Sequence, residues 1–94
     1  MTKEIILTFL RTHKDELRQK YGVRRIGLFG SYARDEATSQ SDIDIVVDMP
    51  SSFTAFFGLQ SYLEEHLEKS IDLGMEKRVR SFIKEQIRQE IIYV

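Results

Sequence analysis

The chain has 94 residues, of which 41% are hydrophobic and 31% charged, and its formal net charge is −1. This length predicts one domain over 1–94, and the absence of cysteine excludes disulfides and thiolate metal sites. A net charge so close to zero gives no reason to expect direct nucleic-acid binding. No apolar run approaches the ~20 residues that span a bilayer, and charged residues interrupt the N-terminal segment, so we expect a cytoplasmic protein without a membrane span or secretory signal.

Apolar spacing predicts the first helix and the first strand. Apolar residues recur at helical spacing through 3–20, and Gly22 is a natural helix stop. Residues 25–29 are short, apolar and rich in strand formers, which predicts a strand. Gly30 and Ser31 then interrupt this strand at a turn.

A second strand is predicted after a short helix and a polar loop. Residues 32–36 are expected to begin a short helix, and Thr, Ser and Gln make 37–41 a loop. Residues 42–49 alternate between Asp and Ile before becoming fully apolar, which is typical of a strand with one buried face. Pro50 is expected to end this strand.

The second half of the chain predicts a long helix, a short strand and a last helix. A helix is predicted over 53–69, and the three phenylalanines at its start are most simply core residues, although so dense a cluster leaves a partial interface role open. Residues 70–74 predict a third strand. Apolar residues at every fourth position predict a helix over 79–92, with Phe82 widening its apolar face, and the two residues after it are expected to pack.

The charges are unevenly distributed, because carboxylates concentrate between Asp35 and Asp48 while the C-terminal segment is basic. The basic residues of that segment are Lys77, Arg78, Arg80, Lys84 and Arg88. They are consistent with a solvated helix face and, alternatively, with a patch that meets a triphosphate or an acidic partner.

The predicted order is helix, strand, short helix, strand, helix, strand, helix (α-β-α-β-α-β-α). Strands that alternate with helices predict an α/β (α+β) fold, here a small mixed three-stranded sheet covered by helices. The connection between the first two strands is too short for a parallel crossover, so these strands are expected to be antiparallel. A full helix separates the second and third strands, which are therefore expected to be parallel.

Asp42 and Asp44 are candidate metal ligands. Side chains two residues apart on a strand leave the same face, with Cα atoms roughly 6.5–7 Å apart, so both carboxylates can converge on Mg²⁺. Such an Asp-x-Asp is also compatible with a turn aspartate followed by a solvent-facing one. Asp72, between two apolar residues of the third strand, can project toward the same pocket and either complete metal binding or accept a proton. His13 and His66 lie far apart on predicted helices and do not predict a zinc site.

Gly30 and Ser31 are candidate phosphate-binding residues, because they follow an apolar strand and open a helix. Backbone N–H groups at a helix start favour anions, glycine permits close approach of a phosphate, and serine adds a hydroxyl. A simple strand-to-helix turn with a capping serine is the alternative interpretation. The phosphate interpretation gains weight because the turn and the three carboxylates occur in chain order on elements that should be neighbours.

The stretch GSYARDEATSQSDIDIVV, with Asp72 as a later acid, resembles the DNA polymerase beta-type nucleotidyltransferase superfamily. The short length and the C-terminal IIYV are similar to its minimal nucleotidyltransferase branch. The resemblance implies a nucleotidyltransferase fold. It also implies that the Gly30 backbone and Ser31 bind the triphosphate of ATP, and that Arg34 contacts phosphate. Asp35 departs from the pattern, since the family often has glycine at that position.

The same resemblance implies that Asp42 and Asp44 hold Mg²⁺. Asp72 matches the third acid, as a metal ligand and as the base toward the acceptor. In this branch the partner is often a small all-helical ribonuclease toxin of the HEPN type. The resemblance therefore implies an antitoxin that transfers AMP from ATP to a tyrosine hydroxyl of such a toxin.

Two other functions remain open for this chain. One is a catalytically vestigial antitoxin that neutralises its toxin by binding alone. The other is a nucleotidyltransferase for a small molecule such as an aminoglycoside, which the lack of a domain to hold the acceptor argues against. A chain of this length must take its acceptor from another molecule, and this requirement fits a protein substrate.

Overall fold

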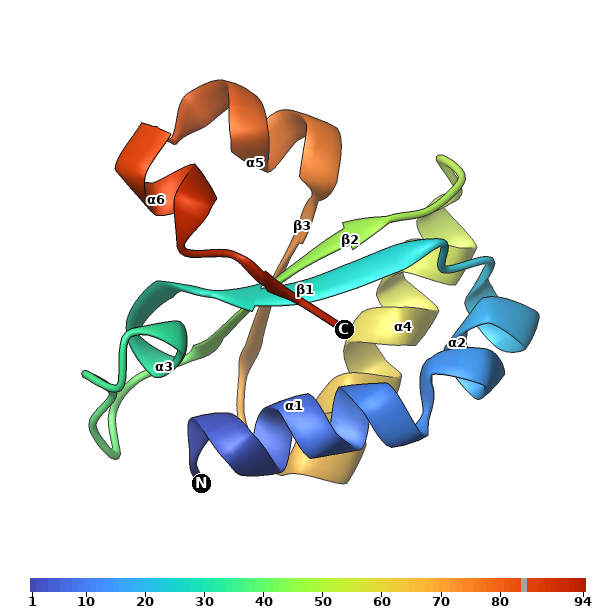
Figure 1. Cartoon of the computed structure of the whole chain (residues 1–94). Helices are drawn as coiled ribbons and strands as arrows, with labels where there is room; N and C mark the ends of the chain where they lie inside the picture. The colour runs from blue at the N-terminus through green and yellow to red at the C-terminus, as the bar shows by residue number, and fades with distance from the viewer. Residues whose placement is uncertain (84) are drawn as a thin grey trace.

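The computed structural model describes residues 1–83 and 85–94. The strands cross the centre of the molecule, with α1, α2 and α4 on one side and α5 and α6 on the other (Figure 1). In chain order the elements are α1 (Lys3–Thr12), α2 (Lys14–Tyr21), β1 (Arg25–Phe29), α3 (Gly30–Ala33), β2 (Ile43–Asp48), α4 (Phe53–Leu67), β3 (Ile71–Met75), α5 (Glu76–Phe82), α6 (Glu85–Gln89) and β4 (Ile92–Tyr93). No helix within these residues combines the length and the apolar character needed to cross a membrane.

The strands form one mixed four-stranded sheet in the order β3-β2-β1-β4. As the connection lengths predicted, β1 and β2 are antiparallel and β2 and β3 are parallel. The prediction of three strands is wrong by one, because β4 pairs antiparallel with β1 at the end of the chain. Pairing continues past β4, since the Val94 N–H donates to the Ile26 carbonyl at 3.1 Å. The α/β fold with a small mixed sheet is confirmed, with one strand more than expected.

A glycine in β1 lets the C-terminal segment lie directly on the sheet. A β-carbon at Gly27 would lie 3.0 Å from both Ile91 Cγ2 and the Ile92 carbonyl oxygen. Two β-branched residues thus pack against β1 in place of continuing a helix, which agrees with their strand preference. The expectation that the last residues pack is confirmed, because Tyr93 is part of β4 and Val94 contacts the core.

The single helix predicted over 79–92 is therefore wrong. α5 starts earlier, at Glu76, and ends at Phe82, because Ile83 adopts extended dihedral angles (φ −98°, ψ 152°). A second short helix, α6, follows before β4. The predicted helix also includes Lys84, which lies outside the described residues.

The helix predicted over 3–20 is interrupted at His13, which caps the end of α1 and the start of α2 (φ −100°, ψ 8°). The interruption lets the apolar residues of both helices reach the same core. Ile6 and Leu10 from α1 and Leu17 from α2 are all completely buried.

The main core lies between one face of the sheet and the helices α1, α2 and α4. Alternate strand residues supply its buried side chains: Ile26, Leu28, Ile43, Ile45, Val47, Ile71 and Leu73. The same alternation turns Asp44, Val46 and Gly74 to the opposite face. There α5 contacts β2 and β3, and Val46 is completely buried. Asp44 is half-buried and Asp72 exposed, so the second face is open where β2 and β3 begin.

The phenylalanine cluster at the start of α4 is not part of the core, contrary to the simplest expectation. Phe53 and Phe57 are 85% and 55% exposed, and Phe56 alone of the three packs against the core. Phe82, expected to widen an apolar face, is 87% exposed. Helical spacing places these side chains correctly on one side of each helix, but that side is left uncovered in the described part of the chain.

Candidate active site

The turn after β1 forms the first wall of the site. α3 begins at Gly30 and not at residue 32, so Gly30 and Ser31 supply N–H groups of its first turn. The backbone of Gly30 has φ +77°, a left-handed conformation that favours glycine. Within the described residues, the Ser31 hydroxyl makes no hydrogen bond, so it is available as a donor.

Asp44 and Asp72 form the second wall. They are direct partners in the parallel ladder between β2 and β3, and Asp44 is also the antiparallel partner of Phe29, the last residue of β1. Side chains that are direct partners on neighbouring strands leave the same face, with Cβ atoms about 4.5–5.5 Å apart. The predicted convergence of these two carboxylates is thus present. Because Phe29 leads directly into α3, the pairing also brings Asp44 to Gly30 and Ser31, the candidate phosphate-binding residues.

The turn and the carboxylate are in contact. A β-carbon added at Gly30 would overlap the carboxylate of Asp44. Residue 30 therefore has two reasons to be glycine, its positive φ and the space that Asp44 occupies.

Three carboxylates gather at this end of the sheet, and among the described residues Arg34 is the one cation that acts on the pKa of Asp44. Burial raises the pKa of Asp44 to about 6, and the charge of Asp72 and then that of Asp42 add to the increase. Arg34 acts in the opposite direction on this pKa, but its effect is the smallest. A half-buried carboxylate held beside others of the same charge is the electrostatic situation in which a bound cation stabilises the site.

Asp42 differs from its expected position. β2 begins at Ile43, so Asp42 lies in the loop just before the strand and is exposed. The prediction that Asp42 and Asp44 share one face of a strand is therefore wrong, because only Asp44 is a strand residue. Asp42 is nevertheless close enough to raise the pKa of Asp44.

The described residues suit a metal ion that protein and substrate bind together, such as Mg²⁺, better than a metal ion that protein side chains bind alone. Among residues 1–83 and 85–94, no cluster of three or more His, Asp or Glu side chains is arranged to enclose a metal ion. Mg²⁺ is usually bound by one or two carboxylates together with substrate phosphates. The opposed pair Asp44 and Asp72, with Asp42 nearby and the candidate phosphate-binding turn in contact with Asp44, is compatible with that requirement.

Arg34 and Asp35 follow α3. Arg34 Nε donates to Glu36 Oε2 and Arg34 Nη1 to Glu90 Oε2, both at 3.4 Å. Asp35 has φ +58°, which explains why glycine is common at this position, and its carboxylate pairs with Lys3 Nζ at 2.9 Å. Its charge is thus neutralised by α1 and does not act alone near a triphosphate.

Sequence reasoning missed Glu90 and Lys3, because ion pairs between residues this far apart leave no local pattern. It also missed that the two histidines meet: the rings of His13 and His66 lie 6.3 Å apart, within an aromatic cluster with Phe9 and Tyr62. Each histidine Nδ1 is 2.8 Å from the carbonyl oxygen four residues earlier. This cluster lies among α1, α2 and α4, on the side of the sheet that carries the main core.

A mixed sheet that brings a glycine turn against paired carboxylates is the arrangement expected of a nucleotidyltransferase. Residues 10–94 match the family model described as nucleotidyltransferase domain. This chain therefore belongs to the nucleotidyltransferase domain family, and the resemblance noted in its sequence is confirmed.

Two relatives are of nearly the same length as this chain. The protein adenylyltransferase MntA of Thermococcus cleftensis is 44% identical over 96 residues, covering 100% of this chain and 97% of that protein. MJ0126 of Methanocaldococcus jannaschii is 41% identical over 92 residues, covering 95% of this chain and 94% of that protein. The chain thus belongs to the minimal branch of the family.

Two solved structures share the fold. A toxin–antitoxin pair with AMP-PNP has a chain that is 28% identical, with a TM-score of 0.55, and the match covers 68% of this chain and 55% of that one. This chain thus spans about half the length of that chain. The mutant toxin–antitoxin pair MntA-HpeT has a chain that is 23% identical, with a TM-score of 0.60, covering 99% of this chain and 71% of that one. The expected nucleotidyltransferase fold is confirmed.

Proposed function

We propose that this protein is a Mg²⁺-dependent adenylyltransferase that transfers AMP from ATP to a tyrosine hydroxyl of a small helical toxin of the HEPN type, and so acts as its antitoxin. The observation that carries the proposal is the direct pairing of Asp44 with Asp72, in contact with the glycine turn of α3. The protein adenylyltransferase name of a full-length relative and the toxin–antitoxin structures support the direction of the proposal.

ATP is bound by its triphosphate at the start of α3. The Gly30 and Ser31 N–H groups and the Ser31 hydroxyl donate to phosphate oxygens, and glycine lets the phosphate approach the backbone. Arg34 exchanges one of its carboxylate partners, Glu36 or Glu90, for a phosphate oxygen. Both existing contacts are long and exposed, so this exchange is favourable.

Asp42 and Asp44 would hold Mg²⁺ together with phosphate oxygens of ATP, and Asp72 would be a further oxygen ligand once nucleotide and ion are bound. When bound, the ion neutralises charge that develops on the transferred phosphoryl group. Burial and the neighbouring carboxylates raise the pKa of Asp44, and a bound cation would lower it again, which supports this assignment.

The reaction joins the acceptor to the α-phosphorus. The tyrosine oxygen attacks this atom, the bond from the α-phosphorus to the oxygen that bridges to the β-phosphate breaks, and pyrophosphate leaves. The hydroxyl proton passes to the carboxylate of Asp72 and then to water. Asp72 suits this role because it is exposed and can reach an acceptor that approaches from the open end of the sheet.

A reconstituted labelling reaction tests the proposal. The protein, ATP labelled in its α-phosphate, Mg²⁺ and the purified product of the adjacent gene are incubated together. Label is expected on the partner protein, and it should be absent with Asp44→Asn or without Mg²⁺. The matched control is Asp48→Asn, on the same face of β2 but paired with Arg24, which should label normally. If the partner is bound and silenced without receiving label, neutralisation by binding alone is correct and this proposal is not.

A further inference from the structure

β3 is an edge strand, and part of its outer edge has backbone N–H and C=O groups without a hydrogen-bond partner among the described residues. In the parallel ladder the Ile43 N–H donates to the Ser70 carbonyl at 3.0 Å, which fixes the alternation of the backbone groups. The N–H and C=O groups of residues 72 and 74 then point toward β2, and those of Ile71, Leu73 and Met75 point away from the sheet.

Within residues 1–83 and 85–94, side chains of the molecule itself bond the backbone of the first of these three residues but not of the other two. Gln60 Nε2 of α4 donates to the Ile71 carbonyl at 3.0 Å, and the Ile71 N–H donates to Glu64 Oε2 at 3.1 Å. Leu73 and Met75 instead line a cavity of about 460 Å³. An uncovered edge is a template for another strand, and native proteins usually protect it.

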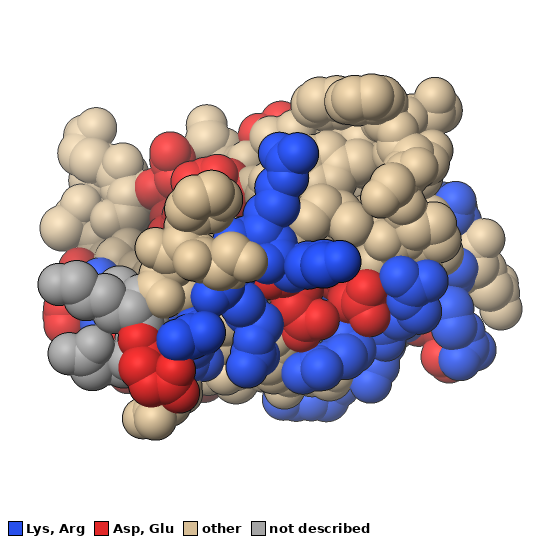
Figure 2. All heavy atoms as spheres, turned by 90° about the horizontal axis from the view of Figure 1, so that it is seen from above, with Lys and Arg blue, Asp and Glu red and all other residues tan. Residues whose placement is uncertain are grey.

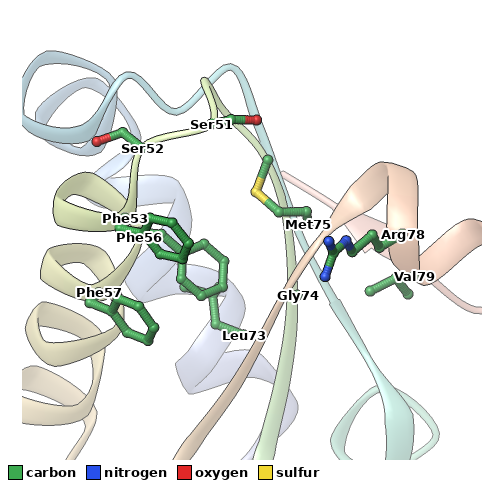
Figure 3. Close-up of a pocket in the computed structure, with 10 residues that line it drawn as sticks. All are labelled: Ser51, Ser52, Phe53, Phe56, Phe57, Leu73, Gly74, Met75, Arg78 and Val79. Atoms are coloured by element: carbon green, nitrogen blue, oxygen red, sulfur yellow. The ribbon is translucent and has the colours of Figure 1, made fainter.

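The cavity beside the open edge is apolar. Phe53, Phe56 and Phe57 of α4 lie on one side of β3, and Arg78 and Val79 of α5 lie on the other (Figure 3). The rings of Phe53 and Phe57 are stacked, 6.3 Å apart, and both are largely exposed. A side chain that enters between α4 and β3 would therefore be apolar, because it would contact aromatic carbon on most sides.

The charge of the cavity is positive. Its lining contains Arg78 but no carboxylate, and among the described residues Arg78 takes part in no ion pair. Lys and Arg side chains gather on the face of the molecule seen in Figure 2, with carboxylates between some of them. A segment with a carboxylate near its apolar residue would complement Arg78 in the lining of the cavity.

We propose that the open edge at Leu73 and Met75 docks an extended, acidic and apolar segment of the acceptor protein as an added strand. The proposal rests on the proposed function for the identity of that protein. The exposed loop over 34–42 of a second copy is a poor candidate for this segment, because it has carboxylates but no large apolar side chain. Backbone hydrogen bonds would hold the segment, and the cavity would select its side chains.

Docking here would bring the acceptor to the reactive carboxylates. Residues of an added strand point to the same face as their direct partners on β3. A residue opposite Asp72 would thus project toward the site that Asp44 and Asp72 share. Since Ile71 is already covered, pairing would end at this point, and the acceptor residue would lie at the end of the docked segment.

Met75 allows a test that changes one backbone group. Its φ of −71° suits proline, and its N–H points away from β2, so Met75→Pro should fold while losing the edge donor. Met75→Ala removes the same side chain but keeps the N–H, and is the matched control. Binding of the purified product of the adjacent gene is measured by calorimetry, and thermal melting confirms that both variants are folded.

We expect Met75→Pro to bind at least about tenfold more weakly than Met75→Ala, because both variants lack the Met75 side chain and only the proline variant also lacks the backbone N–H. Hydrogen exchange of the complex gives a second result: the amides of Leu73 and Met75 should become protected on binding, while those of Asp72 and Gly74 are protected in both states. Equal binding by the two variants, unchanged exchange at Leu73 and Met75, or no binding by the wild type overturns the inference. If the proline effect is found but no AMP is transferred, docking at β3 stands and the proposed catalysis fails.

Discussion

Gly30 and Asp44 are fitted to each other across the junction of β1, α3 and β2. The backbone of Gly30 has φ +77°, and the space that a β-carbon would fill there is taken by the carboxylate of Asp44. The turn at Gly30 and the carboxylate of Asp44 thus form one structural unit, and we expect a change in either to displace the other.

Gly30→Ala should lose at least about 100-fold in AMP transfer, because moving a reactive group by about 1 Å is enough for such a loss. The positive φ should also destabilise the fold by about 1–2 kcal/mol. Gly22→Ala is the matched control, since Gly22 has φ +75° but lies at the end of α2, away from the carboxylates. Both variants should melt at lower temperature in calorimetry, and Gly22→Ala alone should keep its activity. Equal loss of activity in both would contradict the fit between Gly30 and Asp44.

The stability of the ligand-free protein should depend on the protonation of Asp44. Folding raises the pKa of Asp44 from 3.8 to about 6, so the folded state holds this proton more tightly than the unfolded state does. The resulting stabilisation is fully present below about pH 4 and is lost as the pH rises through about 6. Asp44→Asn should therefore melt at a higher temperature than the wild type at pH 8, although it is inactive.

Asp48→Asn is the control variant, because folding shifts the pKa of Asp48 in the opposite direction from that of Asp44. Hydrogen bonds from Arg24 lower the pKa of Asp48, so this carboxylate stabilises the fold above its unfolded pKa, and that contribution is lost as the pH falls through its folded pKa. At pH 8 its substitution should leave the melting temperature unchanged or lower. If Asp44→Asn melts at a lower temperature than the wild type at pH 8, the charge of Asp44 does not destabilise the ligand-free protein and the prediction is contradicted.

The pairing of β2 with β3 and the meeting of Asp44 and Asp72 were predictable from the sequence, because connection length decides strand direction and alternation decides the face. β4 was not, since a two-residue strand has no periodicity of its own and depends on the close approach that Gly27 allows. The exposure of Phe53 was not predictable either. Helical spacing shows which residues share a face, but not whether another element covers that face.

Glu90→Gln should lower the KM for ATP about twofold to fivefold with little change in kcat, because it frees one side of the Arg34 guanidinium for phosphate. Glu85→Gln is the control, since Glu85 pairs with Arg88. Steady-state kinetics over a range of ATP concentrations measure both constants. An unchanged or higher KM in Glu90→Gln would show that Arg34 is not a phosphate ligand.

Asp35→Gly should keep AMP transfer within about twofold of the wild type. The substitution relieves a positive φ but loses the contact with Lys3, and these effects oppose each other, so stability should change by less than about 1 kcal/mol. Asp35→Ala loses the ion pair and keeps the strained backbone, so it should melt at a lower temperature than Asp35→Gly. The reverse order of melting temperatures would contradict backbone strain at residue 35, because both variants lack the Lys3 contact and differ only in the β-carbon.

The intact mass of the partner protein tests the central claim most directly. The product of the adjacent gene is co-expressed with the wild type, with Asp44→Asn or with Asp48→Asn, purified and weighed by mass spectrometry. The account predicts the added mass of AMP with the wild type and Asp48→Asn, and an unmodified partner with Asp44→Asn. An unmodified partner with the wild type, or an AMP adduct with Asp44→Asn, would contradict it.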